Sequence, residues 1–297
     1  MEEIVKFYVA NSFARTGWGG NPAGVVAGYP HLDADVMQYI ARQLNLVETV
    51  FASWQENSRE VQLRYFTPEK ELAMAGHPTI AAFITLIQKY FREPVEGEYT
   101  IITKGGRQPV GVIKTGTGYA VRMEQKAARF VNEEKNARKV AATLGIQVQD
   151  INDDLPIEAV DTGLGHLIVP VTSLEALNRI ERRVAELAEL CRENGIREVQ
   201  AYTFLEPNKV YTRNICPKQG LEDPACGMGN GALGAYLLKN YYKNADNITL
   251  EALQGDIVSL PSEITILAER RNEGAIVPSV QGSARLVIEG SMNVAKM

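Results

Sequence analysis

Residues 75–91, AGHPTIAAFITLIQKYF, and residues 226–241, CGMGNGALGAYLLKNY, decide the fold. Each segment opens with small residues around a glycine and continues with apolar side chains in nearly every direction around a helical axis. A helix that is apolar all round must be buried on all sides, so each segment predicts a central helix enclosed by strands. We expect these helices over residues 78–91, with Pro78 at the first helical position, and over residues 229–241.

The two segments are related by an offset of 151 residues, about half of the 297-residue chain. At that offset the aligned identities include Glu71 with Glu222, Gly76 with Gly227, Ala81 with Ala232, Leu86 with Leu237, and Tyr90 with Tyr241. Such sparse identities can arise by chance, but the shared order of strand, Pro-containing turn, glutamate, glycine and buried helix favours a duplication. The sequence therefore predicts two similar domains, residues 1–123, completed by a final strand over about 284–297, and residues 124–283.

Short strands and a few amphipathic helices surround the two segments, which predicts an α+β protein. Asp33 is expected to cap a half-buried helix that reaches Leu44. Asn132 is expected to cap a helix over residues 133–144, and Ser173 to precede one long amphipathic helix that ends near Asn194.

Composition excludes several classes of protein. The net charge of −5 and the absence of any Lys/Arg run predict no nucleic-acid partner and no acidic membrane surface. The three cysteines, without a CxxC or a Cys/His cluster at zinc spacing, predict neither a disulfide framework nor a metal site. No secretion signal or membrane-spanning apolar run is evident, so we expect a cytoplasmic protein.

The start of each central helix has a chemical consequence. The first amide groups of a helix have no partner inside it and carry partial positive charge. Two such helices related by a pseudo-twofold axis would direct both N-termini into one cleft, which suits a small carboxylate or an oxyanion. The alternative is two glycine-capped core helices with no ligand.

Six short motifs, in order along the chain, resemble those of the PhzF family, the phenazine-biosynthesis isomerases and their relatives. The motifs are Gly20-Asn21-Pro22-Ala23-Gly24-Val25, Glu48-Thr49-Val50-Phe51, Arg64-Tyr65-Phe66-Thr67-Pro68, Ala75-Gly76-His77-Pro78-Thr79, Thr162-Gly163 with His166, and Glu222-Asp223-Pro224 with Gly227. Each motif is weak alone, but together they cover most of the chain. The resemblance implies the diaminopimelate-epimerase-like fold, in which two pseudo-symmetric domains each wrap a β-barrel-like sheet around a central helix and the active site lies between them.

The resemblance also implies an activity. Glu48 matches the family's catalytic acid/base, and His77 and Asp223 match two further catalytic positions. The implied reaction moves a proton at carbon in a small carboxylic acid without a metal or an organic cofactor, and members resemble homodimers. Substrate contacts are expected from Asn21, Gly76, Cys226, Gly227 and Met228.

The residues themselves leave alternatives open. Glu48 follows apolar residues, an environment that raises the pKa of a carboxyl group and suits it to exchange protons. The same pattern also fits an exposed glutamate at the start of a strand. Without the motif, His77 is interpreted as a helix cap or as a polar residue with its hydrogen bonds made inside the protein. Asp223 is interpreted as a turn residue before Pro224.

Cys226 raises a separate question. Racemases of this fold use two cysteines, one before each central helix, and here Ala75 occupies the first position. Relatives commonly carry threonine at Cys226, a small polar residue at Met228 and serine at Val47, and these changes suggest a less polar ligand. We therefore expect an isomerase. The alternatives are an epimerase or racemase of an amino acid with Glu48 and Cys226 as opposed bases, and a non-catalytic acid-binding protein.

Overall fold

The computed structural model describes residues 2–56, 58–92, 96–217 and 222–295. The chain divides into two compact units, residues 1–123 with 282–297, and residues 124–281. Residues 1, 296 and 297 of the expected first domain lie outside the described residues. Among the described residues, no helix combines the length and the apolar character needed to cross a membrane.

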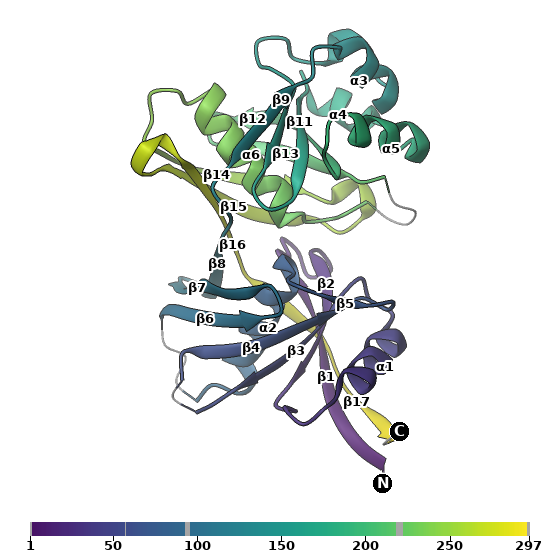
Figure 1. The fold of residues 1–297 in the computed structure, drawn as a ribbon, viewed down its shortest axis with the longest axis vertical. Coiled ribbons are helices and arrows are strands. Elements are labelled where there is room, and N and C mark those ends of the chain that lie inside the picture. The colour runs from purple at the N-terminus through teal and green to yellow at the C-terminus, as the bar shows by residue number, and fades with distance from the viewer. Residues whose placement is uncertain (1, 57, 93–95, 218–221, 296–297) are drawn as a thin grey trace. The chain divides into compact units, whose positions relative to one another are not determined.

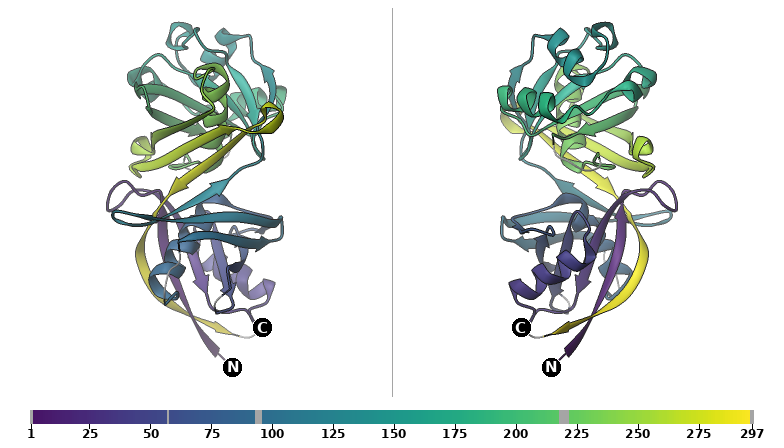
Figure 2. Two further views of the ribbon diagram at one scale, coloured as in Figure 1. Left: turned by 90° about the vertical axis from the view of Figure 1, so that its left-hand side faces the viewer. Right: turned by 90° about the vertical axis from the view of Figure 1, so that its right-hand side faces the viewer.

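The first unit wraps its strands around α2, the helix over Gly76–Lys89, whose residues Pro78 to Ile87 are all buried. Contacts to α2 come from β1, β2, β3 and β17 (Figure 1). The other elements of the first unit are β1 (Glu2–Ser12), β2 (Asn21–Ala27), α1 (Ala34–Leu44), β3 (Thr49–Trp54), β4 (Glu60–Phe66), β5 (Glu71–Leu72), β6 (Gly97–Thr103), β7 (Gly106–Thr115), β8 (Gly118–Glu124) and β17 (Ala284–Ala295). The N-terminal strand β1 pairs antiparallel with the C-terminal strand β17 (Figure 2).

The second unit encloses α6, the helix over Gly227–Asn240, in the same manner. Gly229 to Leu238 are buried, and strands β10, β11, β12, β14 and β15 contact the helix. The other elements are β9 (Arg129–Glu133), α3 (Ala137–Leu144), β10 (Glu158–Asp161), β11 (Gly165–Pro170), α4 (Leu174–Arg179), α5 (Val184–Glu193), β12 (Glu198–Glu206), β13 (Lys209–Ile215), β14 (Asn247–Gln254), β15 (Ser262–Arg270) and β16 (Ile276–Gly282).

Both units follow one order of strand pairing. In the first unit, neighbouring strands follow the order β17, β1, β2, β3, β4, β6, β7 and β8. The pairs β2 with β3 and β4 with β6 are parallel, and the other neighbouring pairs are antiparallel. In the second, the parallel pairs are β11 with β12 and β13 with β14, at the same places in the order from β9 to β16. Each parallel pair is joined through helices, because parallel neighbours need a crossover connection. The shared order is what a duplicated unit would produce.

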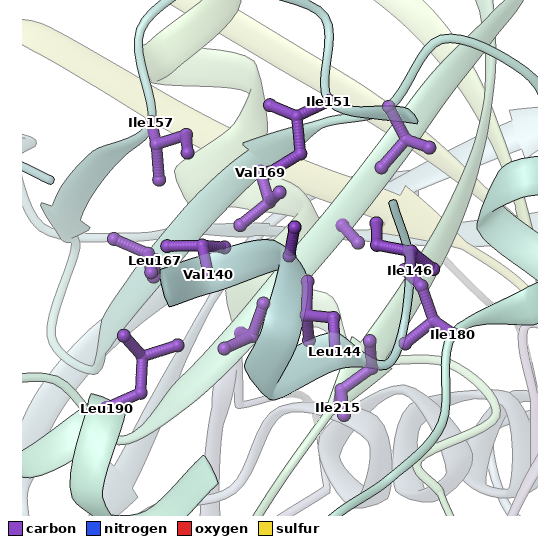
Figure 3. Packing of buried hydrophobic residues seen from close by; sticks show 14 of the residues in the cluster. Val140, Leu144, Ile146, Ile151, Ile157, Leu167, Val169, Ile180, Leu190 and Ile215 are labelled. Carbon is purple, nitrogen blue, oxygen red and sulfur yellow. The ribbon is translucent and has the colours of Figure 1, made fainter. Parts of the chain in front are cut away.

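A second core lies in the second unit, on the outer side of its strands. Helices α3, α4 and α5 pack against β11, β12 and β13 there, and their apolar residues converge (Figure 3). Val140 and Leu144 of α3, Leu167 and Val169 of β11, and Leu190 of α5 are fully buried. The first unit has a smaller counterpart in which α1 covers β3, with Ile40 fully buried.

Both central helices begin earlier than the sequence indicated. Helix α2 starts at Gly76, so Pro78 is its third residue rather than its first, and α6 starts at Gly227 rather than Gly229. A proline is still tolerated at the third position, since amide groups of the first turn have no intrahelical partner.

Two expectations for the helices of the second unit were wrong. Asn132 lies in strand β9, which pairs with β10, and Asn136 caps α3 instead by accepting a hydrogen bond from the Lys139 amide (3.0 Å). The long helix expected after Ser173 is two helices that are separated at residues 180–183. The cap at Asp33 was predicted correctly, and Ser173, expected only to precede a helix, caps α4 through its side chain.

Candidate active site

The expected site residues fall into two groups, one in each unit. Glu48, His77, Asn21 and Gly76 belong to the first unit, and Asp223, Cys226, Gly227 and Met228 to the second. Each group gathers at the N-terminus of its central helix.

Glu48 is positioned by its backbone at the start of β3. Its carbonyl oxygen accepts a hydrogen bond from the Gly24 amide of β2 (3.0 Å). A Cβ atom on Gly24 would lie 2.7 Å from Thr49 Oγ1, so the two parallel strands approach this closely only because residue 24 is glycine. The motif glycine thus places Glu48 where the connection from α1 enters the sheet.

His77 lies beside Glu48 at the first turn of α2. Its Nδ1 is 3.6 Å from Glu48 Oε2, and the two side chains are only 10% and 18% exposed. Burial lowers the pKa of His77 to about 4, although the nearby Pro22 backbone opposes the shift. The imidazole is therefore neutral at neutral pH, and Glu48 faces no full positive charge from it.

The N-terminus of α2 is polar and open. Ala75 offers no side-chain cap, and the first turn carries no acidic residue. A Cβ atom on Gly76 would meet nothing within 4 Å. The amides of Gly76 and His77 therefore border free space where the helix dipole favours an anion.

Asn21 is linked to the first turn of α2 by Ser12 of strand β1. It is buried and pairs in register with Ser12, whose hydroxyl group donates to the His77 carbonyl oxygen (2.6 Å). Gly20 has a φ of 90°, and a Cβ atom there would lie 2.7 Å from the Ser12 carbonyl oxygen. The positive φ explains the glycine before Asn21.

In the second unit, a buried polar network fixes the loop before α6. Gln254 Nε2 donates to the Asp223 carbonyl oxygen (2.7 Å), while Asn230 Nδ2 donates to the Cys226 carbonyl oxygen (2.9 Å) and to Gln254 Oε1 (2.8 Å). The Asp223 carboxylate accepts a hydrogen bond from the Ala225 amide (2.9 Å). Burial nevertheless raises the pKa of Asp223 to about 6, with a further contribution from Glu198.

Cys226 caps α6 by accepting a hydrogen bond at Sγ from the Gly229 amide (3.3 Å). Burial, Asp223 and Glu198 all raise the pKa of this thiol well above its ordinary value. Gly227 is held at its carbonyl oxygen by Gln125 Nε2 (2.8 Å). The methyl group of Met228 lies against Gly163, where a Cβ atom would approach it to 3.4 Å.

The structure adds a cluster that the sequence did not predict. His166 was named only as part of a motif, and Glu198 was not considered. Both lie at Cys226: His166 Nε2 is 3.8 Å from Cys226 Sγ and 3.4 Å from Glu198 Oε2. These three residues come from β11, β12 and the loop before α6, so no local spacing in the sequence reveals the cluster.

Known proteins similar to this chain agree with the motifs and the fold. The family model described as phenazine biosynthesis-like protein (PhzC-PhzF) matches residues 10–290. The chain belongs to the PhzF family. An uncharacterized isomerase of Bacillus subtilis is 32% identical over 269 residues, which cover 89% of each chain. The PhzF-family membership predicted from the motifs is thus confirmed, and so is the assignment of the chain to the isomerases.

Solved structures confirm the predicted fold of this PhzF-family chain. The crystal structure of a PhzF-family phenazine biosynthesis protein of Bacillus anthracis matches with a TM-score of 0.88 and 25% identity, over 98% of this chain and 99% of that one. A hydroxyproline epimerase of Agrobacterium vitis matches with a TM-score of 0.62 and 12% identity, over 98% and 91%. At that identity the epimerase shows the shared fold alone, which is the diaminopimelate-epimerase-like fold.

Proposed function

We propose that this PhzF-family isomerase moves a proton at carbon in a small carboxylic acid, with Glu48 as the general acid/base. The observation that carries the proposal is the half-buried pair of Glu48 and a neutral His77 at the open N-terminus of α2. An imidazolium ion at this distance would form an ion pair with the Glu48 carboxylate and compete with its role as a base, whereas a neutral imidazole does not.

The amides at the start of α2 supply the other part of the reaction. When a proton leaves a carbon next to a carboxylate, negative charge develops on the carboxylate oxygens. The Gly76 and His77 amides, with the partial positive charge of the helix, would stabilise that charge, and no acidic residue in the first turn opposes it. The open space at Gly76 supports the presence of a ligand there.

We assign Asp223 a hydrogen bond to a polar group of the substrate. Its pKa of about 6 keeps an appreciable protonated fraction near neutral pH, so it can donate as well as accept. Val47 lies next to Glu48 in the chain and is 65% exposed, and this apolar side chain supports a substrate with an apolar portion.

Solvent deuterium exchange tests the role of Glu48. Candidate small carboxylic acids are incubated with the enzyme in D2O, and deuterium incorporation is followed by NMR. We expect Glu48→Gln to abolish the incorporation while thermal unfolding stays cooperative, and Glu56→Gln, at an exposed glutamate near the end of β3, to leave the rate unchanged. Incorporation by Glu48→Gln at the wild-type rate would reject the assignment.

An epimerase with Glu48 and Cys226 as opposed bases is the second candidate, supported by the cap that Cys226 forms on α6. The raised pKa keeps the Cys226 thiol protonated at neutral pH, so little thiolate is available to act as a base, and this supports the first candidate. Loss of exchange on Cys226→Ala with Glu48 intact would support the epimerase. Full exchange would exclude it.

A further inference from the structure

We propose that His166, Glu198 and Cys226 form a binding site for a thiophilic divalent metal ion, and that Zn²⁺ fits it best. The inference departs from the sequence, which predicted no metal site, and it does not rest on the proposed isomerase mechanism. All three side chains belong to the second unit, and their ligand atoms lie within 4.8 Å of one another.

The separations suit a tetrahedral ion. Zinc–nitrogen and zinc–oxygen bonds of about 2.0–2.1 Å, and a zinc–sulfur bond of about 2.3 Å, place N and S about 3.6 Å apart and N and O about 3.4 Å apart. The observed distances from His166 Nε2 are 3.8 Å to Cys226 Sγ and 3.4 Å to Glu198 Oε2. The third separation, between Cys226 Sγ and the Glu198 carboxylate, lies within 4.8 Å, so around one ion these two groups would move toward each other.

The surroundings orient the ligands as metal sites do. His166 Nδ1 lies 2.9 Å from the Leu164 carbonyl oxygen, which can only accept, so Nδ1 carries a proton. The other ring nitrogen, Nε2, faces the sulfur and the carboxylate. A backbone partner on the distal nitrogen is the usual second contact of a metal-bound histidine. The Gly229 amide in turn donates to the sulfur.

His166 Nε2 and Glu198 Oε2 face each other inside the protein, where His166 is fully buried and the Glu198 side chain is only 13% exposed. Imidazole, thiolate and carboxylate together are a donor set that Zn²⁺ prefers, and three protein ligands leave its fourth position to water or an anionic group.

Metal titration of the full-length enzyme tests the site. The chain is stripped with a chelator under reducing conditions, and Zn²⁺ alone is titrated in competition with a chromophoric chelator. We expect one Zn²⁺ per chain. Co²⁺ in its place should give the near-ultraviolet absorption of a thiolate-to-cobalt transition. No stoichiometric binding by the wild-type chain would overturn the proposal.

Matched variants identify the ligands. Cys226→Ser should lose the cobalt–thiolate absorption and weaken Zn²⁺ binding by at least about 100-fold. Mutating a residue that only hydrogen-bonds to a metal ligand already costs up to about that much. Cys191→Ser is the control, because Cys191 is buried and its pKa responds to Glu198, yet it is not in the cluster. Equal losses in the two variants would reject Cys226 as a ligand.

Two further variants keep the test independent of folding and of the isomerase mechanism. If Cys226→Ser does not fold, Glu198→Gln replaces it, since that side chain is partly exposed, and it should weaken Zn²⁺ binding similarly. Wild-type affinity in Glu198→Gln would contradict the site. Glu48→Gln, which abolishes deuterium exchange under the proposed function, should bind Zn²⁺ like the wild-type chain, so either proposal can fail alone.

Discussion

At the scale of single residues, the chemistry depends on titratable groups whose surroundings restrict their charge. His77 was predicted as a site residue from its motif, but its neutrality follows from burial, which the sequence does not show. Glu198 went unnoticed because a glutamate at a strand start is ordinarily exposed. Its position beside His166 results from the parallel pairing of β11 with β12, which sets His166 directly opposite Glu198.

Burial of neutral His77 predicts a pH-dependent contribution to stability. The unfolded chain takes up the His77 proton near pH 6.5, whereas the folded chain resists it until about pH 4. The contribution is therefore fully present above pH 6.5 and is lost as the pH falls toward 4. We expect the wild-type chain to lose about 3 kcal/mol more than His77→Gln between pH 7.5 and 4.5.

Urea unfolding of both proteins at the two pH values measures this difference. Other titrating groups are common to both and cancel in the comparison. A difference in unfolding free energy that does not change with pH would show that His77 accepts its proton as readily in the folded chain as in the unfolded one.

At the scale of elements, local patterns located helices well and their ends poorly. The apolar periodicity after Ser173 continues across residues 180–183, so the sequence indicated one helix. The break is instead associated with Arg213, on β13, which donates to the carbonyl oxygens of Leu177 (2.8 Å) and Ile180 (2.9 Å). A partner more than 30 residues away leaves no local signal.

The Arg213 side chain also forms one of two equivalent ion pairs. It contacts Glu222 in two hydrogen bonds (2.9 and 2.8 Å), with 4% and 8% of the side chains exposed. In the first unit Arg64 contacts Glu71 (2.8 Å), but there 37% of the arginine is exposed. The glutamates are the pair aligned by the 151-residue offset, so the two units share this interaction but differ in its burial.

This difference in burial predicts different energetic roles. Glu222→Gln should lower the unfolding free energy by about 3 kcal/mol, because the Arg213 charge remains buried without its carboxylate. Glu71→Gln, the matched control, should cost about 1 kcal/mol or less, since water screens the exposed pair. Chemical denaturation measures both. Equal costs would show that burial does not distinguish the two pairs.

At the scale of the whole molecule, the repeat was visible in the sequence only as sparse identities, whereas the strand pairings show it plainly. Pairing order is a non-local property that single residues do not encode. The second unit is also continuous in sequence and has two cores of its own, one around α6 and one beneath α3, α4 and α5.

We therefore predict that residues 124–281, expressed alone, fold cooperatively. The buried residues of the two cores should supply enough apolar area for a domain of this size. Near-ultraviolet circular dichroism and urea unfolding of the fragment provide the measurement. A fragment with secondary structure but no cooperative transition would mean that the second unit depends on the rest of the chain.

The pairing of β1 with β17 has a consequence for biosynthesis. Strand β1 is made well before β17, and the two strands pair over eleven register positions. Until β17 emerges, one edge of β1 has no partner, while residues 124–281 are already made. The second unit is thus able to mature before the first, and the nascent chain carries an exposed β-edge while the second unit is synthesised.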